Sequence, residues 1–418
     1  AKFSTAWNAN TQNYWNHAGM NSIAQRRLKF EKFVRKRLVV SRRNALTAVA
    51  GATGALVSGR AALGRPGNQL AQSEAGTYRA FEIGEQKGPE TLRLVERPID
   101  PPNPGQVMIR VTATSINARD HGLISNRFPI PRGRRPGDRI PISEGAGVVL
   151  EVGAGVTQVQ PGDRVTATHF SSWVKGPWDP EQSYIGDVGN NIDGWLSEIA
   201  YLPAQALVKL PEGVSEETAA TFVSSGVTAW HALYEVARVK PGDVVLALGT
   251  GGVSSFGVQL AKASGAKVVV TSSSDKKLED MKEHGADIGI NYRSNPNWGQ
   301  AVMDATDGHG ADIVLENVGR RTLDQSLMGT AVNGYVVMIG TERLPEQLPK
   351  MPGFYMKNIT MKAISNASVE MLSDMVQAYA VNGLKPVITK RFKFEDAADA
   401  FRYQREHDGI GKVIIEHS

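Results

Sequence analysis

Short apolar runs alternate with helically spaced segments through the middle of the chain. The apolar runs predict strands at residues 244–248, 267–271, 287–291, 312–316 and 335–339. The helical spacing predicts helices at residues 253–264, 276–284, 298–305 and 323–329. Because a run such as 244–248 has no polar position to face water, both faces of the sheet must be covered. The pattern therefore predicts an α/β fold with a doubly wound parallel sheet.

The segments on either side of this α/β stretch have a different pattern. Upstream, short strands are separated by Pro-Gly turns, and a long aromatic loop follows them at residues 170–195. The predicted strands outside the α/β stretch lie at residues 107–113, 145–153, 163–167, 387–388 and 412–415, and the predicted helices at 227–237 and 397–403. Strand-rich segments thus flank the α/β stretch on both sides.

The first 76 residues carry a charge unlike that of the rest. They hold twelve Lys and Arg against two acidic residues, which is +10 in a sequence whose formal net charge is +5. The remaining residues are therefore mildly acidic, at −5, and give no electrostatic basis for binding nucleic acid. No stretch reaches the ~18 apolar residues that a membrane-spanning helix needs, so we predict no stable membrane insertion.

This basic head has the pattern of a targeting segment. Arg42 and Arg43 precede an uncharged run at residues 44–59 that is rich in Ala, Gly, Thr and Val. This order resembles a twin-arginine export signal, which would carry the folded protein to the periplasm. An Arg-rich, acid-poor head is also typical of an organellar presequence, and a chain whose leader is unused would stay in the cytoplasm. We assign residues 1–76 to a leader or disordered extension.

The predicted strand at 244–248 leads into a glycine-rich turn and then into a helix. The turn reads Gly249-Thr250-Gly251-Gly252-Val253-Ser254. The first glycine permits the tight turn, and the second lets the backbone approach a pyrophosphate. The start of the helix supplies free N–H groups and a positive dipole end. Since further strands and helices alternate after it, we interpret this turn as the phosphate-binding loop of a Rossmann dinucleotide site.

The end of the second predicted strand indicates which dinucleotide binds. An NAD-selective site has Asp or Glu here, where it bonds the ribose hydroxyls. This sequence has Ser272 and Ser273 instead, and Lys277 follows them. An uncharged corner beside a cation can receive a 2′-phosphate, so NADP(H) is the predicted cofactor. Asp275 lies close enough in sequence to leave NAD(H) as the alternative.

Several short motifs occur in a fixed order along the body of the chain. They are Ser115-Ile116-Asn117-Ala118-Arg119-Asp120, Ser143-Glu144-Gly145-Ala146-Gly147, Gln160-Pro161-Gly162-Asp163-Arg164-Val165, Ser225-Gly226-Val227-Thr228-Ala229-Trp230, the glycine-rich turn and Gly411-Lys412-Val413. With these motifs, nearly all of the sequence from Tyr78 to Ser418 resembles the medium-chain dehydrogenase/reductase superfamily. The greatest likeness is to its zinc-independent, NADP-dependent alcohol dehydrogenase and quinone oxidoreductase-like branch.

The resemblance implies a GroES-like partial β-barrel catalytic domain built around a central Rossmann domain. It assigns residues 77–207 to the GroES-like domain, 208–365 to the NADP-binding Rossmann domain and 366–418 to a C-terminal return to the catalytic domain. Cofactor and substrate are expected to meet between the two domains. Members of the family often pair through the Rossmann sheet, so a homodimer is an expectation.

The resemblance also implies cofactor contacts for particular residues. Asn117 is expected to bond the nicotinamide ribose or amide, and Thr228 to lie under the nicotinamide. Lys412 is expected to approach the cofactor from the C-terminal segment. The other expected contacts are Ser272, Lys277 and Tyr292 around the 2′-phosphate, and Val318, Ile339 and Gly340 along the nicotinamide.

The sequence differs from the zinc-dependent members of the family at the positions that bind their zinc ion. Those enzymes carry Cys, His-Glu and Cys where this sequence has Asn117, Ser143-Glu144 and Ser224. Glu144 alone cannot form a tetrahedral zinc site. The sequence contains no cysteine, which excludes a four-cysteine structural zinc site, a disulfide and a cysteine nucleophile. We therefore predict a metal-free enzyme.

Without a metal, a hydrogen-bond donor must stabilise the oxygen that gains charge on hydride transfer. Asn117 and Tyr184 are the candidate catalytic residues, and His169, His121 and backbone N–H groups are further candidates. Each side chain also has a plainer structural interpretation, as part of a loop or a strand end. Water or the cofactor ribose could supply the proton instead.

The predicted function is hydride transfer between NADP(H) and a small carbonyl, alcohol, quinone or enone substrate. Two alternatives remain open. One is an enoyl or quinone reductase that acts only in the reducing direction. The other is a non-catalytic NADPH-binding structural or sensor protein, which would bind NADPH without consuming it.

Overall fold

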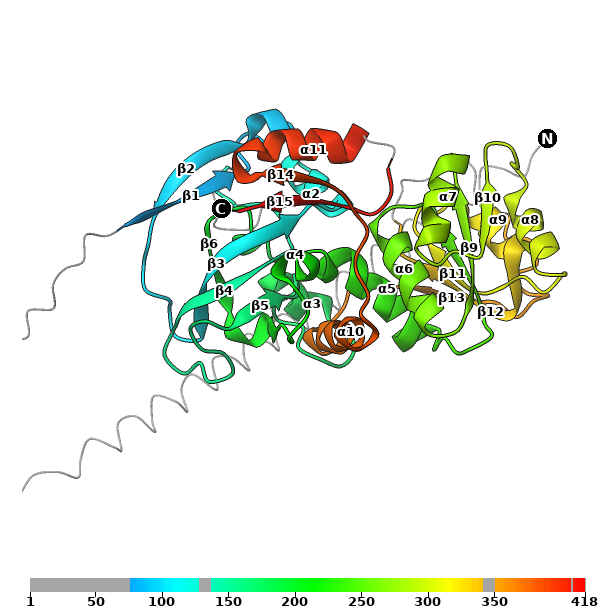
Figure 1. Cartoon of the computed structure of the whole chain (residues 1–418), viewed down its shortest axis with the longest axis horizontal. Helices are drawn as coiled ribbons and strands as arrows, with labels where there is room; N and C mark the ends of the chain where they lie inside the picture. The colour runs from blue at the N-terminus through cyan, green and yellow to red at the C-terminus, as the bar shows by residue number, and fades with distance from the viewer. Residues whose placement is uncertain (1–75, 128–136, 341–349, 407–408, 418) are drawn as a thin grey trace, which may run out of the picture. The chain divides into compact units, whose positions relative to one another are not determined.

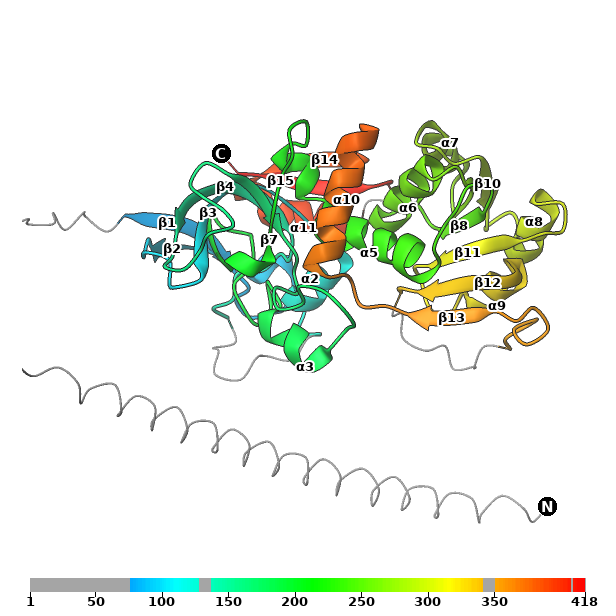
Figure 2. The ribbon, with the colours of Figure 1, turned by 90° about the horizontal axis from the view of Figure 1, so that it is seen from below.

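Six parallel strands form the sheet that carries the glycine-rich turn (Figures 1 and 2). The computed structural model describes residues 76–127, 137–340, 350–406 and 409–417. The strands lie in the order β10-β9-β8-β11-β12-β13. Their bounds are β8 Val244–Leu248, β9 Lys267–Ser272, β10 Ile288–Asn291, β11 Ala311–Glu316, β12 Thr330–Met338 and β13 Thr360–Ala363. The order reverses between β8 and β11, and ligands bind outside the carboxyl ends of the strands at such a point.

Helices cover both faces of this sheet, as its apolar strands require. Val245 and Ala247 of β8 join one hydrophobic core, while Val244 and Leu246 join the core on the opposite face. The helices that contribute to the first core are α6 (Gly252–Ala263) and α7 (Asp275–Glu283), and those that contribute to the second are α8 (Trp298–Ala305) and α9 (Leu323–Gly329). The prediction of a doubly wound parallel sheet is confirmed.

Strands from both sides of the α/β stretch form a second, seven-stranded sheet. Its order is β14-β15-β3-β4-β5-β7, and β6 pairs with β3. The bounds are β3 Gln106–Ser115, β4 Gly145–Val152, β5 Arg164–Ala167, β6 Ile199–Pro203, β7 Leu207–Lys209, β14 Ile388–Lys393 and β15 Lys412–Glu416. β15 runs antiparallel to β3 with Ile414 opposite Ser115, which brings Lys412 beside the residues that follow β3. Helix α11 (Ala397–Glu406) lies along β14 and β15 (Figure 1).

The remaining elements surround these two sheets. β1 (Thr77–Glu82) and β2 (Arg93–Pro98) form an antiparallel pair. The remaining α-helices are α2 (Ala118–Ile124), α3 (Pro180–Ser183), α4 (Glu216–Ala219), α5 (Val227–Trp230) and α10 (Val369–Asn382), and short 3₁₀ turns lie at Pro89–Thr91, Tyr184–Gly186, Ala204–Ala206 and Phe394–Asp396. The aromatic loop predicted at 170–195 therefore contains one short helix and one 3₁₀ turn.

The helix predicted at 227–237 is present as far as Val236, but most of it is not an α-helix. Only Val227–Trp230 is α-helical, and π-helical turns at Phe222–Gly226 and His231–Val236 flank it. Such turns are frequent at functional sites because they displace the register of the following side chains. Here the first π-helical turn carries Ser224 and Ser225, which take part in the buried polar network described below.

Strand β13 was not predicted from the sequence, because all four of its residues are exposed and it has no apolar run. β12 begins at Thr330, five residues before the predicted strand at 335–339. The predicted leader at 1–76 lies outside the described residues except for Gly76. Within the described ranges, no helix is both long and apolar enough to span a membrane. The domain boundaries at 207 and 365 remain predictions.

A buried histidine beside β3 gives the fold a predicted pH dependence. His417 lies against Thr114, with 3.2 Å from Nε2 to Oγ1, and burial lowers its pKa from 6.5 to about 3. Below pH 6.5, His417 is therefore protonated in the unfolded chain but stays unprotonated in the folded chain until the pH approaches 3. We expect the unfolding free energy to fall by up to roughly 1.4 kcal/mol per pH unit as the pH decreases from 6.5 towards 3.

Denaturant titrations of the wild type and of His417→Gln across pH 4–7 measure this effect. Gln cannot titrate and can still bond Thr114, so the variant should show a shallower slope. Equal slopes for the two proteins would contradict the assignment to His417.

Candidate functional site

The glycine-rich turn joins β8 to α6 in a form that suits a pyrophosphate. Gly249 has φ +76°, in the left-handed region that favours glycine. A Cβ built on Gly249 or Gly251 meets nothing within 4 Å, so the backbone of the turn borders open space. The first N–H groups of α6, at Gly252 and Val253, have no acceptor within the helix. The predicted phosphate loop therefore fits a dinucleotide.

The C-terminal segment is fastened to this turn. The Gly411 N–H donates to the Thr250 carbonyl over 2.9 Å, and Gly251 and Gly411 form an isolated parallel bridge. A Cβ on Gly252 would lie 2.5 Å from Ser225 Oγ and 2.8 Å from Lys412 Cδ. Only glycine at 252 therefore lets Lys412 pass this close to the start of α6.

The expected 2′-phosphate corner lies at the end of β9. Ser272 and Ser273 are buried, and Lys277 Nζ donates to Ser273 Oγ over 3.0 Å. The Tyr292 N–H donates to the Ser272 carbonyl over 2.9 Å, which places the tyrosine at the same corner with its side chain partly exposed. The Asp275 carboxylate accepts from the Asn291 side chain. The predicted residues are thus brought together, with one buried ammonium among them.

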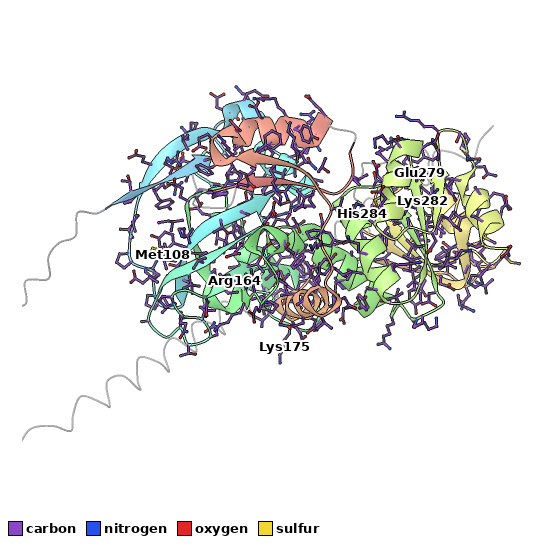
Figure 3. The ribbon with its side chains drawn as sticks, viewed as in Figure 1. Met108, Arg164, Lys175, Glu279, Lys282 and His284 are labelled. Atoms are coloured by element: carbon purple, nitrogen blue, oxygen red, sulfur yellow. The ribbon has the colours of Figure 1, made fainter. Side chains whose placement is uncertain are left out.

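The other lysines of α7 form ion pairs with acidic residues on the solvent-exposed side of the helix. Lys282, which Figure 3 labels together with Glu279, pairs with that residue over 2.7 Å. Lys276 pairs with Asp280 over 3.0 Å. Their side chains are exposed, whereas Lys277 is buried. Of the three described lysines on α7, Lys277 is therefore the one whose charge faces the serines.

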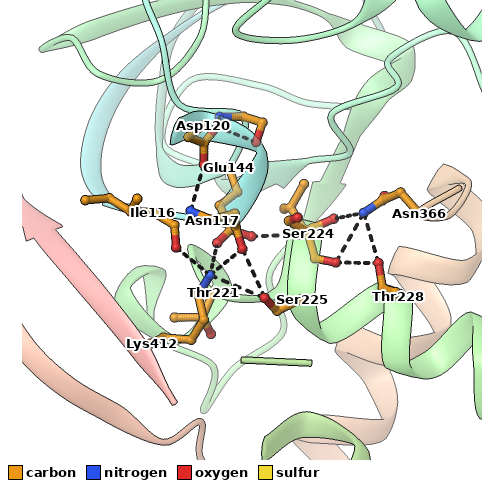
Figure 4. A network of polar contacts seen from close by, with 12 residues as sticks. Ile116, Asn117, Asp120, Glu144, Thr221, Ser224, Ser225, Thr228, Asn366 and Lys412 are labelled. Atoms are coloured by element: carbon orange, nitrogen blue, oxygen red, sulfur yellow. Dashed lines mark hydrogen bonds and ion pairs between the residues drawn. The ribbon is translucent and has the colours of Figure 1, made fainter. Parts of the chain in front are cut away.

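A buried ion pair joins Lys412, the first residue of β15, to Glu144, which directly precedes β4 in the same sheet. Lys412 Nζ is 2.7 Å from Glu144 Oε1 and 2.6 Å from Asn117 Oδ1, and it donates to the Ile116 carbonyl over 3.1 Å (Figure 4). Lys412 is 3% exposed and Glu144 is fully buried. The other carboxylate oxygen of Glu144 accepts from the Ser224 N–H over 2.7 Å. The resemblance predicted that Lys412 approaches the cofactor, and did not predict its pairing with Glu144.

The orientation of the Asn117 amide follows from this network. Asn117 Oδ1 accepts from Lys412 Nζ and, over 3.0 Å, from Ser225 Oγ. An ammonium can only donate, so the opposite amide orientation would place an NH₂ group against it. Asn117 Nδ2 is buried and has no hydrogen-bond partner within the described chain. The network thus leaves one oriented N–H donor unused.

The residues at the metal-ligand positions of zinc-dependent relatives do not fit a zinc ion. Asn117 and Glu144 hold the Lys412 ammonium, and Ser143 Oγ donates to Asp120 over 3.0 Å. A cation already lies among these oxygens, and no thiolate or imidazole is present to complete a tetrahedral site. Across the described ranges, no group of three or more His, Cys, Asp and Glu residues could hold a metal ion.

The expected nicotinamide end of the site is ordered by a buried carboxylate that the sequence did not single out. Glu316 Oε1 accepts from the Val318 and Gly319 N–H groups over 3.0 and 2.9 Å, and the Glu316 carbonyl accepts from Ile339 and Gly340. Glu316 is fully buried at the end of β11. The predicted residues 318, 339 and 340 therefore meet around one residue, Glu316, whose carboxylate and backbone carbonyl both accept their N–H groups.

A second residue missed from the sequence is Asn366. Its Nδ2 donates to the Val223 and Ser224 carbonyls over 3.1 and 3.2 Å and lies 3.3 Å from Thr228 Oγ1. Its Oδ1 is buried without a partner within the described chain. Asn366 has φ +44°, which asparagine tolerates better than most residues. It fixes the position of Thr228, which the resemblance placed under the nicotinamide.

Tyr184 lies apart from the Lys412 network in an aromatic cluster. Its ring centroid is 5.6 Å from that of Phe170 and 5.8 Å from that of Trp178, and the residue is 48% exposed. The His169 ring is tilted against that of Phe170, with centroids 4.1 Å apart. Burial, with the charge of Arg119, holds the pKa of His169 well below 6.5. The lowered pKa disfavours the imidazolium form that His169 would need to donate a proton.

The remaining histidine candidate lies on α2. His121 Nε2 lies against the Gln404 side-chain oxygen, and burial lowers the pKa of this histidine. Its ring packs against Phe401 of α11, with centroids 5.3 Å apart. This partner and this packing account for His121 as a structural residue.

Comparison with known proteins agrees with this arrangement. A family model described as an alcohol dehydrogenase GroES-like domain matches residues 103–212, and one described as a zinc-binding dehydrogenase matches residues 252–380. A zinc-type alcohol dehydrogenase-like protein of Schizosaccharomyces pombe is 38% identical over 75% of this chain and 91% of its own length. A quinone oxidoreductase of Pseudomonas aeruginosa is 29% identical over 81% of this chain and 99% of its own.

Solved structures share the two-domain fold. An NAD-dependent alcohol dehydrogenase superposes with a TM-score of 0.72 at 28% identity, covering 81% of this chain and 99% of its own. A mycobacterial protein in complex with NADPH superposes with a TM-score of 0.67 at 26% identity, over the same shares of the two chains. The GroES-like and Rossmann parts predicted from the sequence are confirmed as the fold. The chain belongs to the medium-chain dehydrogenase/reductase superfamily of oxidoreductases.

Proposed function

We propose that this chain is a zinc-independent oxidoreductase that transfers a hydride between NADP(H) and a small carbonyl, alcohol, quinone or enone. The observation that carries the proposal is the junction at Gly252, where the phosphate turn meets the Lys412 network. The turn that would bind the dinucleotide is joined, through the bridge between Gly251 and Gly411, to the residues that surround Asn117. Recognition of the cofactor and of the reacting oxygen are thereby linked through one short segment.

The contacts support a role for particular residues in binding the cofactor. The turn at 249–253 would receive the pyrophosphate, and Ser272, Ser273 and Lys277 would receive the 2′-phosphate. Residues 318, 339 and 340 would border the nicotinamide. When bound, the nicotinamide supplies the hydride, and the protein contributes orientation and a dry environment.

Zinc independence is part of the proposal and rests on the donor chemistry. Lys412 supplies a fixed positive charge among Ile116, Asn117 and Glu144. A divalent cation at the same oxygens would be repelled by the ammonium and would lack soft or imidazole ligands.

Titration of the purified protein with NADPH and NADH, followed by an acceptor panel, tests the proposal. We expect NADPH to bind at least about tenfold more tightly than NADH, because one charge-assisted phosphate contact contributes ~1.5–3 kcal/mol. NADPH should be consumed with at least one aldehyde, quinone or enone, and dialysis against a chelator should leave the rate unchanged. Absence of binding to either coenzyme, or loss of activity that zinc restores, would overturn the proposal.

The same panel separates the alternatives. A reductase that works in one direction consumes NADPH with quinones or enones and does not oxidise any alcohol with NADP⁺. A structural or sensor protein binds NADPH without consuming it in the presence of every acceptor.

A Tyr184 variant tests whether Tyr184 or Asn117 donates the hydrogen bond to the reacting oxygen. Tyr184 is half exposed and belongs to a ring cluster, so Tyr184→Phe keeps the packing and removes only the hydroxyl. We expect the variant to retain kcat within about twofold, because Asn117 Nδ2 is a buried donor that has no partner within the described chain. A fall of roughly a hundredfold in kcat in steady-state assays would instead assign the hydrogen-bond donor to Tyr184.

A further inference from the structure

Lys412 has no hydrogen left for a substrate. Its three N–H bonds face the Ile116 carbonyl, Asn117 Oδ1 and Glu144 Oε1 at 3.1, 2.6 and 2.7 Å. The next oxygen, Ser225 Oγ at 3.5 Å, donates its own hydrogen to Asn117 Oδ1. The ammonium therefore acts only on the groups that hold it, and chiefly on the Asn117 amide.

The Asn117 amide is the group through which this charge can act on a ligand. Two donors bind its oxygen, and its buried nitrogen has no partner within the described chain. A buried donor without an acceptor is destabilising, and such groups recur where a ligand supplies the acceptor. A cation on the amide oxygen also polarises the amide and makes its N–H a stronger donor.

We propose that Lys412 is a positioning residue that locks and polarises the Asn117 amide, and that Asn117 Nδ2 donates to the substrate oxygen on which charge collects during reduction. This inference rests on the proposed function. In a carbonyl substrate, the carbon gains a hydride with its electron pair from the reduced coenzyme, which is thereby oxidised. The C=O π electrons pass to oxygen, which then takes a proton from water. In a quinone or enone the same oxygen becomes a phenolate or enolate.

The backbone links this device to the phosphate turn. Lys412 directly follows Gly411, whose N–H is bonded to Thr250, and the Lys412 stem passes over Gly252. A displacement of the turn therefore displaces the ammonium and the amide that it holds. The oxygen donor is thus aligned by the same segment that binds the pyrophosphate.

Two variants test the inference. The first removes the donor at the cost of one added buried carboxylate, and the second keeps the buried charges balanced. Asn117→Asp keeps the oxygen that faces Lys412 and replaces the unused donor with an acceptor. Lys412→Met with Glu144→Gln removes both charges of the ion pair together. Lys357→Met is the matched control, because Lys357 Nζ donates to the Met328 and Thr330 carbonyls outside the site.

Three readouts apply to each variant: the Kd of NADPH, the single-turnover rate of NADPH oxidation with the best acceptor, and the binding of isobutyramide to the NADPH-loaded protein. Isobutyramide is an unreactive amide whose oxygen resembles that of a carbonyl substrate. We expect the rate to fall at least 100-fold in Asn117→Asp and about tenfold in the double variant. Isobutyramide binding should weaken in parallel. The Kd of NADPH should stay within about threefold of the wild-type value, a change no larger than the loss of one weak contact with the coenzyme would cause. The Lys357→Met control should match the wild type in all three.

Each outcome decides the inference. A rate and amide affinity in Asn117→Asp equal to those of the wild type overturn it while leaving the proposed function standing. A loss confined to the Kd of NADPH also overturns it, since Asn117 would then serve the coenzyme alone. If the wild type binds NADPH but reduces no acceptor, the difference in isobutyramide binding still decides. A wild type that binds no coenzyme overturns the proposed function and this inference together.

Discussion

The Lys412→Met variant should lose about 3–5 kcal/mol of unfolding free energy, because it leaves the Glu144 carboxylate buried without its cation. Glu144 is fully buried, and its other oxygen already accepts from the Ser224 N–H, so water cannot replace the ammonium without opening the site. Guanidinium denaturation followed by tryptophan fluorescence measures the loss, since the chain has seven tryptophans.

The double variant Lys412→Met/Glu144→Gln provides the comparison. Neutral groups of similar size should restore most of the lost free energy, because desolvation of the carboxylate is no longer required. The difference between the single and double variants then measures the cost of the unpaired carboxylate. Equal unfolding free energies in the two variants would contradict the prediction.

Ser272→Asp should exchange the preferred coenzyme. A carboxylate at the end of β9 would lie in the corner that we assign to the 2′-phosphate, and two like charges about 4 Å apart repel by ~4 kcal/mol near a protein surface. We therefore expect the Kd of NADPH to rise roughly 100-fold. The Kd of NADH should fall, because a carboxylate there can accept from the ribose hydroxyls. Fluorescence titration with both coenzymes measures the exchange.

Two lysine variants separate the local contact from net charge. Lys277→Met removes the ammonium that lies against Ser273, and should weaken NADPH about tenfold without changing NADH. Lys276→Met removes the same charge one residue earlier, from a side chain that pairs with Asp280 in solvent, and should change neither Kd beyond about twofold. If both lysine variants weakened NADPH equally, the effect would be one of net charge and the assigned corner would be wrong.

Elements whose residue types are determined by local burial or local backbone geometry were predictable from the sequence. β8 has no polar position because both of its faces are covered, so its five residues predicted a buried parallel strand at its observed bounds. The glycine-rich turn was predictable because backbone geometry alone requires glycine at 249. β13 gave no such indication, since its residues are exposed along one edge of the sheet.

Contacts between distant segments could not be read from local pattern. The pairing of Lys412 with Glu144 depends on β15 lying beside β3, which only the folded chain establishes. Glu316 and Asn366 each have an ordinary sequence context, and their roles come from the N–H and C=O groups that the fold brings to them. The π-helical turns likewise depend on packing, which overrode the apolar pattern of residues 227–237.

The bond between Gly411 and Thr250 has a consequence for synthesis of the protein. Residues 117, 144, 225 and 252 emerge from the ribosome long before residue 412, yet the oriented amide exists only when residue 412 is in place. The Rossmann sheet can form during translation, because its strands lie close together in the chain. A nascent chain that stops short of β15 would therefore hold a folded glycine-rich turn without the contact between Lys412 and Asn117.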